Sequence, residues 1–284
     1  MTRSLDPDDL RGSVVVAMDG SEHAERAIRW AAEEAELERR RLVVLAVGDR
    51  ASTSVEDAVA STQLRHPDLC LLPRVVPGDP RQVLVDASAH AFVLVLGSRG
   101  RGAMKSLLLG SVSAAVSAQA VCPVVICRPP GDGSVSAGVV VGADGTRESL
   151  AVIEFAYRQA FLRRLPLTVL HSFFDATVAV AQYRQARGQE TDTPALDDLR
   201  AGLSQSVAGL AEDYPGVPVT FDVKHGLADE ALAPRHAGWD LIVVGRHPMT
   251  SLERLLTGSV ATAVLERAHC TVAVVPEDRA TADD

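Results

Sequence analysis

Short apolar runs alternate with longer segments of helical period along the whole chain. In the first half, runs rich in Val, Leu and Ile predict strands at residues 14–18, 41–47, 71–76, 92–97 and 122–129. Apolar positions at helical spacing predict helices after Ser21 and at residues 81–90 and 111–120. Uninterrupted apolar strands separated by helices are typical of a parallel sheet covered on both faces. Right-handed crossovers then predict a doubly wound α/β domain that binds ligands at the carboxyl ends of its strands.

The second half of the chain repeats the first. Residues 13–31, SVVVAMDGSEHAERAIRWA, resemble residues 138–156, GVVVGADGTRESLAVIEFA. In both copies an apolar run ends in Asp-Gly followed by a hydroxyl residue. Three landmarks recur at one constant spacing: Gly97 as Gly245, Gly110 as Gly258 and Cys122 as Cys270. This self-similarity, in a chain of 284 residues, predicts two doubly wound parallel-sheet domains in tandem.

Proline and glycine mark the boundary between the two copies. The segment PPGDGSVSAG, residues 129–138, has the composition of a linker. We therefore predict one domain at residues 1–131 and a second at residues 132–284. The interval between the Asp-Gly motif and the later glycines is longer in the second copy, so the second domain contains an insertion. We place it at residues 173–198, a polar stretch expected to form a long loop with a helical piece.

Composition and charge exclude several classes of function. Hydrophobic residues make up 47% of the chain and charged residues 23%, as in ordinary globular proteins. The net charge of -9 argues against a protein that coats nucleic acid, and an aromatic content of 4% is too low for single-strand stacking platforms. No apolar leader and no membrane-length apolar segment are seen, so we expect a cytoplasmic protein without a membrane partner. The four cysteines lack metal-ligand spacing, and we expect Cys122 and Cys127 to be buried thiols.

Candidate chemistry follows two of the predicted strands. Asp19 and Gly97 lie just past strand ends, so a parallel sheet can bring them to one crevice. After Gly97, the segment GSRGRGAMKSLLLGS supplies further glycines, which let main-chain amides approach an anion without a Cβ in the way. The helix predicted from Ser111 adds unpaired amides, a positive dipole end and the hydroxyls of Ser111 and Ser113. This combination predicts a phosphate site, with Asp19 suited to ribose hydroxyls or an adenine edge.

Other readings of these residues stay open. Arg99, Arg101 and Lys105 are either cations beside the phosphates or solvated surface charges. The glycines match neither a P-loop nor the dinucleotide fingerprint, because neither motif follows the first strand. No nucleophile–base pair and no paired carboxylates emerge from the spacing, so we assign no catalytic residue and no metal ligand.

At these motifs the chain resembles the universal stress protein family in its tandem form. The family signature is glycine, two residues, glycine, nine residues, then Gly-Ser or Gly-Thr, and GSRGRGAMKSLLLGS matches it. The resemblance implies a five-stranded parallel sheet in each half and ATP as the ligand, with or without Mg²⁺. The implied nucleotide site consists of Asp19, the main chain around Val47, Gly97, Gly100, Gly110, Ser111, Val112 and Ser113. It also implies pairing of the final strands, residues 122–129 and 270–277, as an intramolecular pseudo-dimer, and association of two chains into a homo-oligomer.

The second half departs from the family signature. In GRHPMTSLERLLTGS, Pro248 replaces the second glycine and has no amide proton to donate. Ala261 stands where the first half has Ser113, so one hydroxyl is lost. A second site would consist of Asp144, Gly245, Gly258, Ser259 and Val260. Two interpretations remain: a weakened nucleotide site, or a half retained only for pairing.

The function expected from the resemblance is that of an ATP-binding regulator of the stress response. Two alternatives belong to other classes. One is a slow ATPase or self-phosphorylating enzyme, with Ser111 or Ser113 near the phosphates, although the spacing supplies no evident general base. The other is an interaction module that binds no nucleotide.

Overall fold

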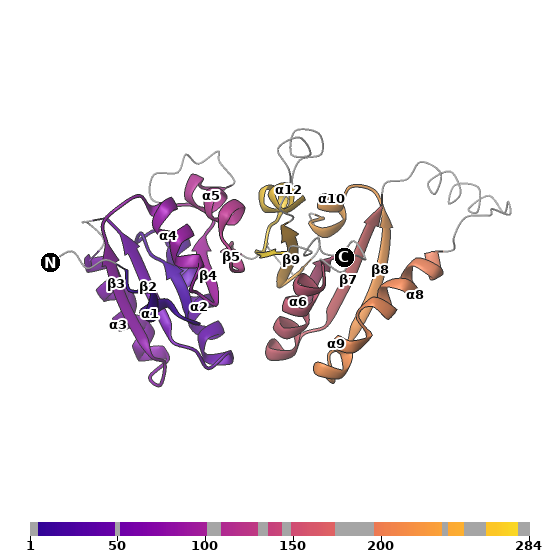
Figure 1. Cartoon of the computed structure of the whole chain (residues 1–284), viewed down its shortest axis with the longest axis horizontal. Helices are drawn as coiled ribbons and strands as arrows, with labels where there is room; N and C mark the ends of the chain where they lie inside the picture. The colour runs from indigo at the N-terminus through magenta and orange to yellow at the C-terminus, as the bar shows by residue number, and fades with distance from the viewer. Residues whose placement is uncertain are drawn as a thin grey trace, which may run out of the picture. The chain divides into compact units, whose positions relative to one another are not determined.

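The computed structural model describes residues 5–48, 52–100, 109–129, 136–143, 149–173, 196–234, 238–246 and 260–277. The chain divides into two compact units, shown in Figure 1. The first unit consists of Met1–Gly131 together with Leu265–Pro276. The second consists of Asp132–Val264 together with Glu277–Asp284. The residues at 265–276, predicted within the second domain, thus group with the first unit.

The first unit contains a parallel sheet with helices on both faces. Its strands are β1 (Val14–Ala17), β2 (Leu42–Val47), β3 (Leu71–Val76), β4 (Val93–Gly97) and β5 (Val124–Cys127). They lie in the order β3-β2-β1-β4-β5, and Val14 is in register with both Leu42 and Val93. Strands β2 and β3 lie on one side of β1, and β4 and β5 lie on the other. The switch point of this doubly wound sheet is therefore between β1 and β4. The predicted fold class is confirmed.

The described part of the first unit contains five helices. They are α1 (Pro7–Leu10), α2 (Glu22–Leu37), α3 (Ser52–Arg65), α4 (Pro80–Ser88) and α5 (Ser111–Gln119). Helix α2 packs against α3, and α4 packs against α5. Ser21 caps α2 as predicted, because its hydroxyl accepts a hydrogen bond from the Ala24 amide at 3.2 Å. The small side chains of Ala27, Ala31 and Ala35 are fully buried and let α2 approach the sheet closely.

Burial explains why the strands read as continuous apolar runs. The valines of β1 at positions 14, 15 and 16 are all inaccessible to solvent, as are Val93, Leu94 and Val95 of β4. Helix α3 was not among the predicted elements. Its buried positions, Val55 and Thr62, are separated by two turns, and one of them is polar, so its apolar face is too sparse to stand out.

The second unit repeats the arrangement. Its strands β6 (Val139–Gly142), β7 (Leu167–Phe173), β8 (Val219–His225) and β9 (Leu241–Arg246) are parallel, in the order β9-β6-β7-β8. Its helices include α6 (Leu150–Arg163), α8 (Leu196–Ser206), α9 (Ala208–Asp213) and α10 (Ala228–Leu232). Of the predicted insertion at residues 173–198, the helical piece begins α8, and residues 174–195 lie outside the described residues.

The last strand of the chain pairs with the first unit. Helix α12 (Val260–Arg267) leads to β10 (Thr271–Pro276), which runs antiparallel to β5. Val272 is opposite Ile126, and Val274 is opposite Val124. Pairing covers an apolar strand edge that would otherwise be open to other chains. The two final strands therefore pair within one chain, as the family resemblance implies.

The cysteines carry no bond to one another. Among the described residues Cys70, Cys122, Cys127 and Cys270 form no disulfide, and Cys122 and Cys127 are buried as predicted. Burial raises the pKa of the Cys122 thiol to about 12, so this thiol stays protonated and unreactive near neutral pH. Within the described ranges no helix has both the length and the apolar character that a membrane span requires.

Candidate functional site

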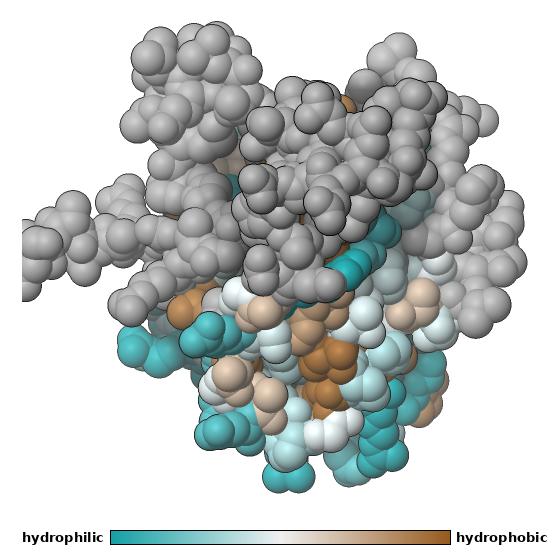
Figure 2. Space-filling view, turned by 90° about the vertical axis from the view of Figure 1, so that its right-hand side faces the viewer, coloured by the Kyte–Doolittle hydropathy of each residue, from teal (hydrophilic) through white to brown (hydrophobic). Residues whose placement is uncertain are grey.

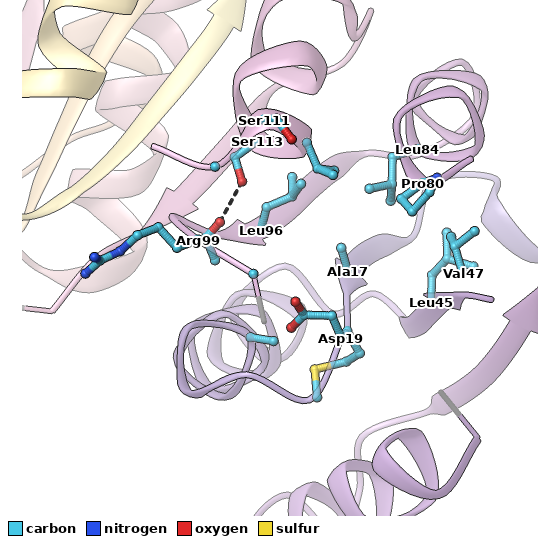
Figure 3. A pocket seen from close by; sticks show the side chains of 16 residues that line it. Ala17, Asp19, Leu45, Val47, Pro80, Leu84, Leu96, Arg99, Ser111 and Ser113 are labelled. Atoms are coloured by element: carbon cyan, nitrogen blue, oxygen red, sulfur yellow. Dashed lines mark hydrogen bonds between the residues drawn. The ribbon is translucent and has the colours of Figure 1, made fainter. Parts of the chain in front are cut away.

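A cavity of about 630 Å³ opens in the first unit at the carboxyl ends of the central strands. It lies at the switch point, where β1 has β2 on one side and β4 on the other. All residues of the predicted first site line it: Asp19, Val47, Gly97, Gly100, Gly110, Ser111, Val112 and Ser113. Segments that are far apart in the sequence thus meet in one pocket, shown in Figure 3.

One end of the pocket is apolar. Figure 3 shows Leu45, Val47, Pro80 and Leu84 grouped there, on the side of the pocket away from Ser111 and Ser113. Met18, Leu96 and two alanines, Ala17 and Ala24, add to the apolar lining. Except for Val47, sequence reasoning missed these residues. The available signal was weak: each lies near a strand end or a helix start, but only the folded sheet shows which of those ends converge.

The opposite end of the pocket is formed by the start of α5. Gly110 is the N-cap, and it offers no side chain to cap the helix. Within the described part of the chain, no acceptor takes the amide hydrogens of Ser111, Val112 and Ser113. A helix start with three unpaired amides and a positive dipole end is a binding site for an anion. The pocket therefore has one apolar end and one end that presents main-chain amides.

Two donors predicted for this end are already used by the protein. The Ser113 hydroxyl, 5% exposed, donates to the carbonyl oxygen of Gly97 at 2.8 Å. The Gly110 amide donates to the carbonyl oxygen of Ser98, also at 2.8 Å. Both bonds tie α5 to the end of β4. Ser113 and Gly110 thus position the amides at the helix start. The expectation that the Ser113 hydroxyl is a further donor for the ligand is wrong, because this hydroxyl donates to the Gly97 carbonyl oxygen.

Asp19 lies between the two ends of the pocket, directly against Gly100. Its Oδ1 accepts a hydrogen bond from the Ser21 amide at 3.0 Å. A Cβ on Gly100 would be 2.6 Å from Asp19 Oδ2, which is too close for any real contact. A side chain at Gly100 would displace the Asp19 carboxylate from this position, and glycine leaves room for it.

Gly97 serves a different contact. A Cβ on Gly97 would lie 2.6 Å from the main-chain carbon of His23, in the first turn of α2. The absence of a side chain at Gly97 lets this helix rest on the end of β4. Asp19, which precedes α2, is thereby held at the pocket.

The cations predicted beside the phosphates differ in their placement. Arg99 lines the pocket, but Figure 3 shows its guanidinium extending away from Asp19 and Ser111. Arg101 and Lys105 lie outside the described residues. The anion-binding end that the structure describes is therefore built from main-chain amides.

His23 lies beneath the glycine turn and was not predicted to belong to the site. Burial lowers its pKa below the usual value of 6.5, and the charges of Arg99 and Arg26 lower it further. Glu22 and Asp19 act in the opposite direction with smaller effect. The imidazole is accordingly neutral at physiological pH.

The second predicted site lies partly outside the described residues. Asp144, Gly258, Ser259 and Pro248 belong to segments that the structure does not describe. Gly245 is the penultimate residue of β9, and the carboxylate of Glu277 fills the space that a Gly245 side chain would occupy. Val260 begins α12, and Ala261 is buried where the first half has Ser113.

The apolar end of the second half is also different. The strand registers make Gly142 the counterpart of Ala17, and Lys224 the counterpart of Val76. Eight residues further along each copy, Leu232 corresponds to Leu84. The Leu232 side chain packs directly over Gly142, only 3.0 Å from where a Cβ would be, and is 1% exposed. Ala17 and Leu84 in the first half instead line the open cavity. In the second half the Leu232 side chain thus occupies the space over Gly142, whereas Leu84, itself 2% exposed, lines the first pocket beside Ala17.

Side chains that could bind a metal ion do not cluster among the described residues. In those ranges no group of three His, Cys, Asp or Glu side chains is arranged to hold a metal ion.

Comparison with known proteins identifies the family. The model of the Universal stress protein family matches residues 11–69, 50–128 and 138–276. The Universal stress protein Rv2623 of Mycobacterium tuberculosis is 30% identical over 294 residues, which cover 93% of this chain and 96% of that protein. A universal stress protein from Archaeoglobus fulgidus has a similar fold, with a TM-score of 0.63, 21% identity, and coverage of 94% of this chain and 98% of that chain. A functionally unknown protein from Pseudomonas aeruginosa gives a TM-score of 0.66 at 17% identity, with coverage of 96% and 94%. The chain belongs to the universal stress protein family.

Proposed function

We propose that the first unit binds ATP in the pocket between β1 and β4, and that the protein acts as a regulator of the stress response in the cytoplasm. One observation carries the proposal. Three unpaired amides at the start of α5, the Asp19 carboxylate and an apolar wall all line the same cavity. Its volume of about 630 Å³ is within the range of small-molecule sites.

Each part of the pocket suits one part of the nucleotide. The wall formed by Leu45, Val47 and Leu84 suits the flat, weakly polar face of the base. The Asp19 carboxylate is an acceptor only, so it suits the ribose hydroxyls and repels phosphate. The amides of Ser111–Ser113 suit the phosphates. Bound nucleotide would order the glycine turn and so change a surface available to partner proteins, which is how occupancy would be signalled.

The proposal is tested by identifying small molecules released from freshly purified protein by mass spectrometry. ATP titrations followed by calorimetry then give affinity and stoichiometry. Asp19→Ala should weaken binding by about 10- to 100-fold, because a hydrogen bond to a charged group is lost. The absence of any adenine nucleotide, both in the purified protein and in titrations at millimolar concentration, would favour the nucleotide-free interaction module.

A phosphate-release assay on the same preparation tests whether the protein is a slow ATPase rather than a regulator without enzymatic activity. Phosphate release that depends on Mg²⁺ and disappears in Gly110→Asp would assign a slow ATPase to this site. Release that persists in Gly110→Asp would come from a contaminant. Competition between ATP and cyclic AMP identifies which adenine nucleotide the site prefers. Size-exclusion chromatography with light scattering tests the homo-oligomer that the family resemblance implies.

A further inference from the structure

Ser98 joins the elements that form the anion-binding end of the pocket. Its carbonyl oxygen accepts the Gly110 amide at 2.8 Å, and its own amide donates to the Cys127 carbonyl oxygen at 3.2 Å. The residue is 2% exposed, so these bonds are shielded from water. Through Ser98, the N-cap of α5 is fixed to the ends of β4 and β5.

The side chain of Ser98 is held in turn by a histidine. The Ser98 hydroxyl lies 3.1 Å from His23 Nδ1. The same nitrogen lies 3.2 Å from a guanidinium nitrogen of Arg26. Arginine can only donate, so Nδ1 must be the unprotonated nitrogen of the ring and must accept from Arg26. The Ser98 hydroxyl hydrogen then also points at Nδ1, so that the two donors share the single lone pair of this nitrogen, and the ring proton is on Nε2.

The surroundings favour this neutral form. Arg26 and Glu22 face the ring from α2, Arg99 faces it from the glycine turn, and Asp19 faces it from the end of β1. Burial and the two arginines outweigh the two carboxylates. A proton on Nδ1 would remove the acceptor for Arg26 and place a third positive charge beside Arg26 and Arg99.

We infer that His23 is a positioning residue of the nucleotide site, which fixes Ser98 as a neutral acceptor and through Ser98 holds the start of α5 in place. His23 contacts no ligand in this role. The main chain of the same residue rests on Gly97, so one residue supports Gly97 directly and Gly110 through Ser98. The inference rests on the proposed function, since it assigns His23 to the site that binds ATP.

The first test measures the affinity for ATP in matched variants. His23→Ala and Ser98→Ala should each raise Kd by about tenfold, the effect of one lost buried hydrogen bond. The double variant should be no worse than either single variant, because both remove the same bond. His23→Asn places an uncharged acceptor near the position of Nδ1 and should restore Kd to within about threefold of the original. His90→Ala, at an exposed histidine of the same unit, should leave Kd unchanged.

The second test needs no nucleotide. Amide hydrogen exchange measured by NMR should become faster at Ser98 and Gly110 in His23→Ala and return to the original rate in His23→Asn. Additive effects of His23→Ala and Ser98→Ala on Kd, or exchange at Gly110 that ignores His23, would overturn the inference. If the unaltered protein binds no ATP, the proposed function fails, whereas the exchange result still decides whether His23 positions α5.

Discussion

Gly97 and Gly100 leave room for different groups. Gly97 leaves room for the main chain of α2, which cannot move without shifting the helix, whereas Gly100 leaves room for one carboxylate, which can rotate. The same substitution should therefore affect different properties at the two positions. A backbone clash costs stability, and a displaced side chain costs function.

Gly100→Ala is predicted to weaken ATP binding with little effect on folding. The new Cβ would force the Asp19 carboxylate away from its place in the pocket, so Kd should rise by about tenfold while the unfolding free energy changes by less than about 1 kcal/mol. Gly97→Ala should instead lower the unfolding free energy by about 1–3 kcal/mol, as overpacking does. Calorimetric titration and urea unfolding measure the two quantities. Gly202→Ala in α8, where a Cβ meets open space, is the control and should be neutral or slightly stabilising. Equal effects at positions 97 and 100 would contradict this assignment.

The neutral His23 predicts a stability that falls in acid. Because folding lowers the pKa of His23 below 6.5, the unfolded chain binds the proton more tightly than the folded protein. This contribution is complete above pH 6.5 and is lost as the pH falls from 6.5 toward the lower folded pKa. Urea unfolding of the first unit at a series of pH values should show the loss, and His23→Asn should lack it. A pH profile that is the same in His23→Asn and in the unaltered protein would exclude this linkage.

Among the secondary-structure elements, α5 has the clearest functional requirement. Its first turn presents amides rather than side chains, and Gly110 has φ of -74° and ψ of 151°. These are the angles that a residue before proline prefers. Proline at the first helical position is also compatible with the helix, because that amide makes no helical bond. The element therefore allows one amide to be deleted without disturbing the fold.

Ser111→Pro is predicted to raise the Kd for ATP by about 10- to 100-fold, because one charge-assisted hydrogen bond to phosphate is lost. Ser111→Ala keeps the amide and loses only the hydroxyl, so its Kd should stay within about threefold of the original. Calorimetry gives both values, and circular dichroism checks that the helix is intact. If the two variants bind alike, the hydroxyl or another group, and not the amide, holds the phosphate.

The elements also show what the sequence could and could not predict. The buried strands were readable because both faces of the sheet are covered, so β1 and β4 are apolar at every position. The eight residues predicted for the site lie in a few short segments, where a sequence motif can identify them. The apolar wall and His23 could not be read in this way, because Pro80, Leu84 and His23 acquire a role only when the folded sheet brings their elements together. The direction of the Ser113 hydroxyl depends on the position of one carbonyl group, which no local pattern encodes.

For the whole molecule, the strand repeat hides a structural asymmetry between the two halves. Both halves keep the strand order of a doubly wound sheet, and β5 is paired with β10 of the same chain. The pocket of the first unit is open, whereas in the second Leu232 closes over Gly142 and the Glu277 carboxylate lies beside Gly245. Burial lowers the pKa of Arg246, and the neighbouring Glu277 charge opposes this shift, so this arginine is already matched with a carboxylate.

One ATP per chain is therefore the predicted stoichiometry. A phosphate near Gly245 would meet the negative charge of Glu277, and Pro248 and Ala261 supply neither the amide nor the hydroxyl of their counterparts. Calorimetry of the full chain should give one site, and the substitution Asp19→Ala should weaken it by about 10- to 100-fold, while Asp240→Ala, at a carboxylate just before the start of β9, should not. Glu277→Gln removes the charge and keeps the shape, so it tests whether charge alone closes the second half. A count of two in the unaltered chain, or one site whose affinity Asp19→Ala leaves unchanged, would show that the second half binds nucleotide despite its altered turn.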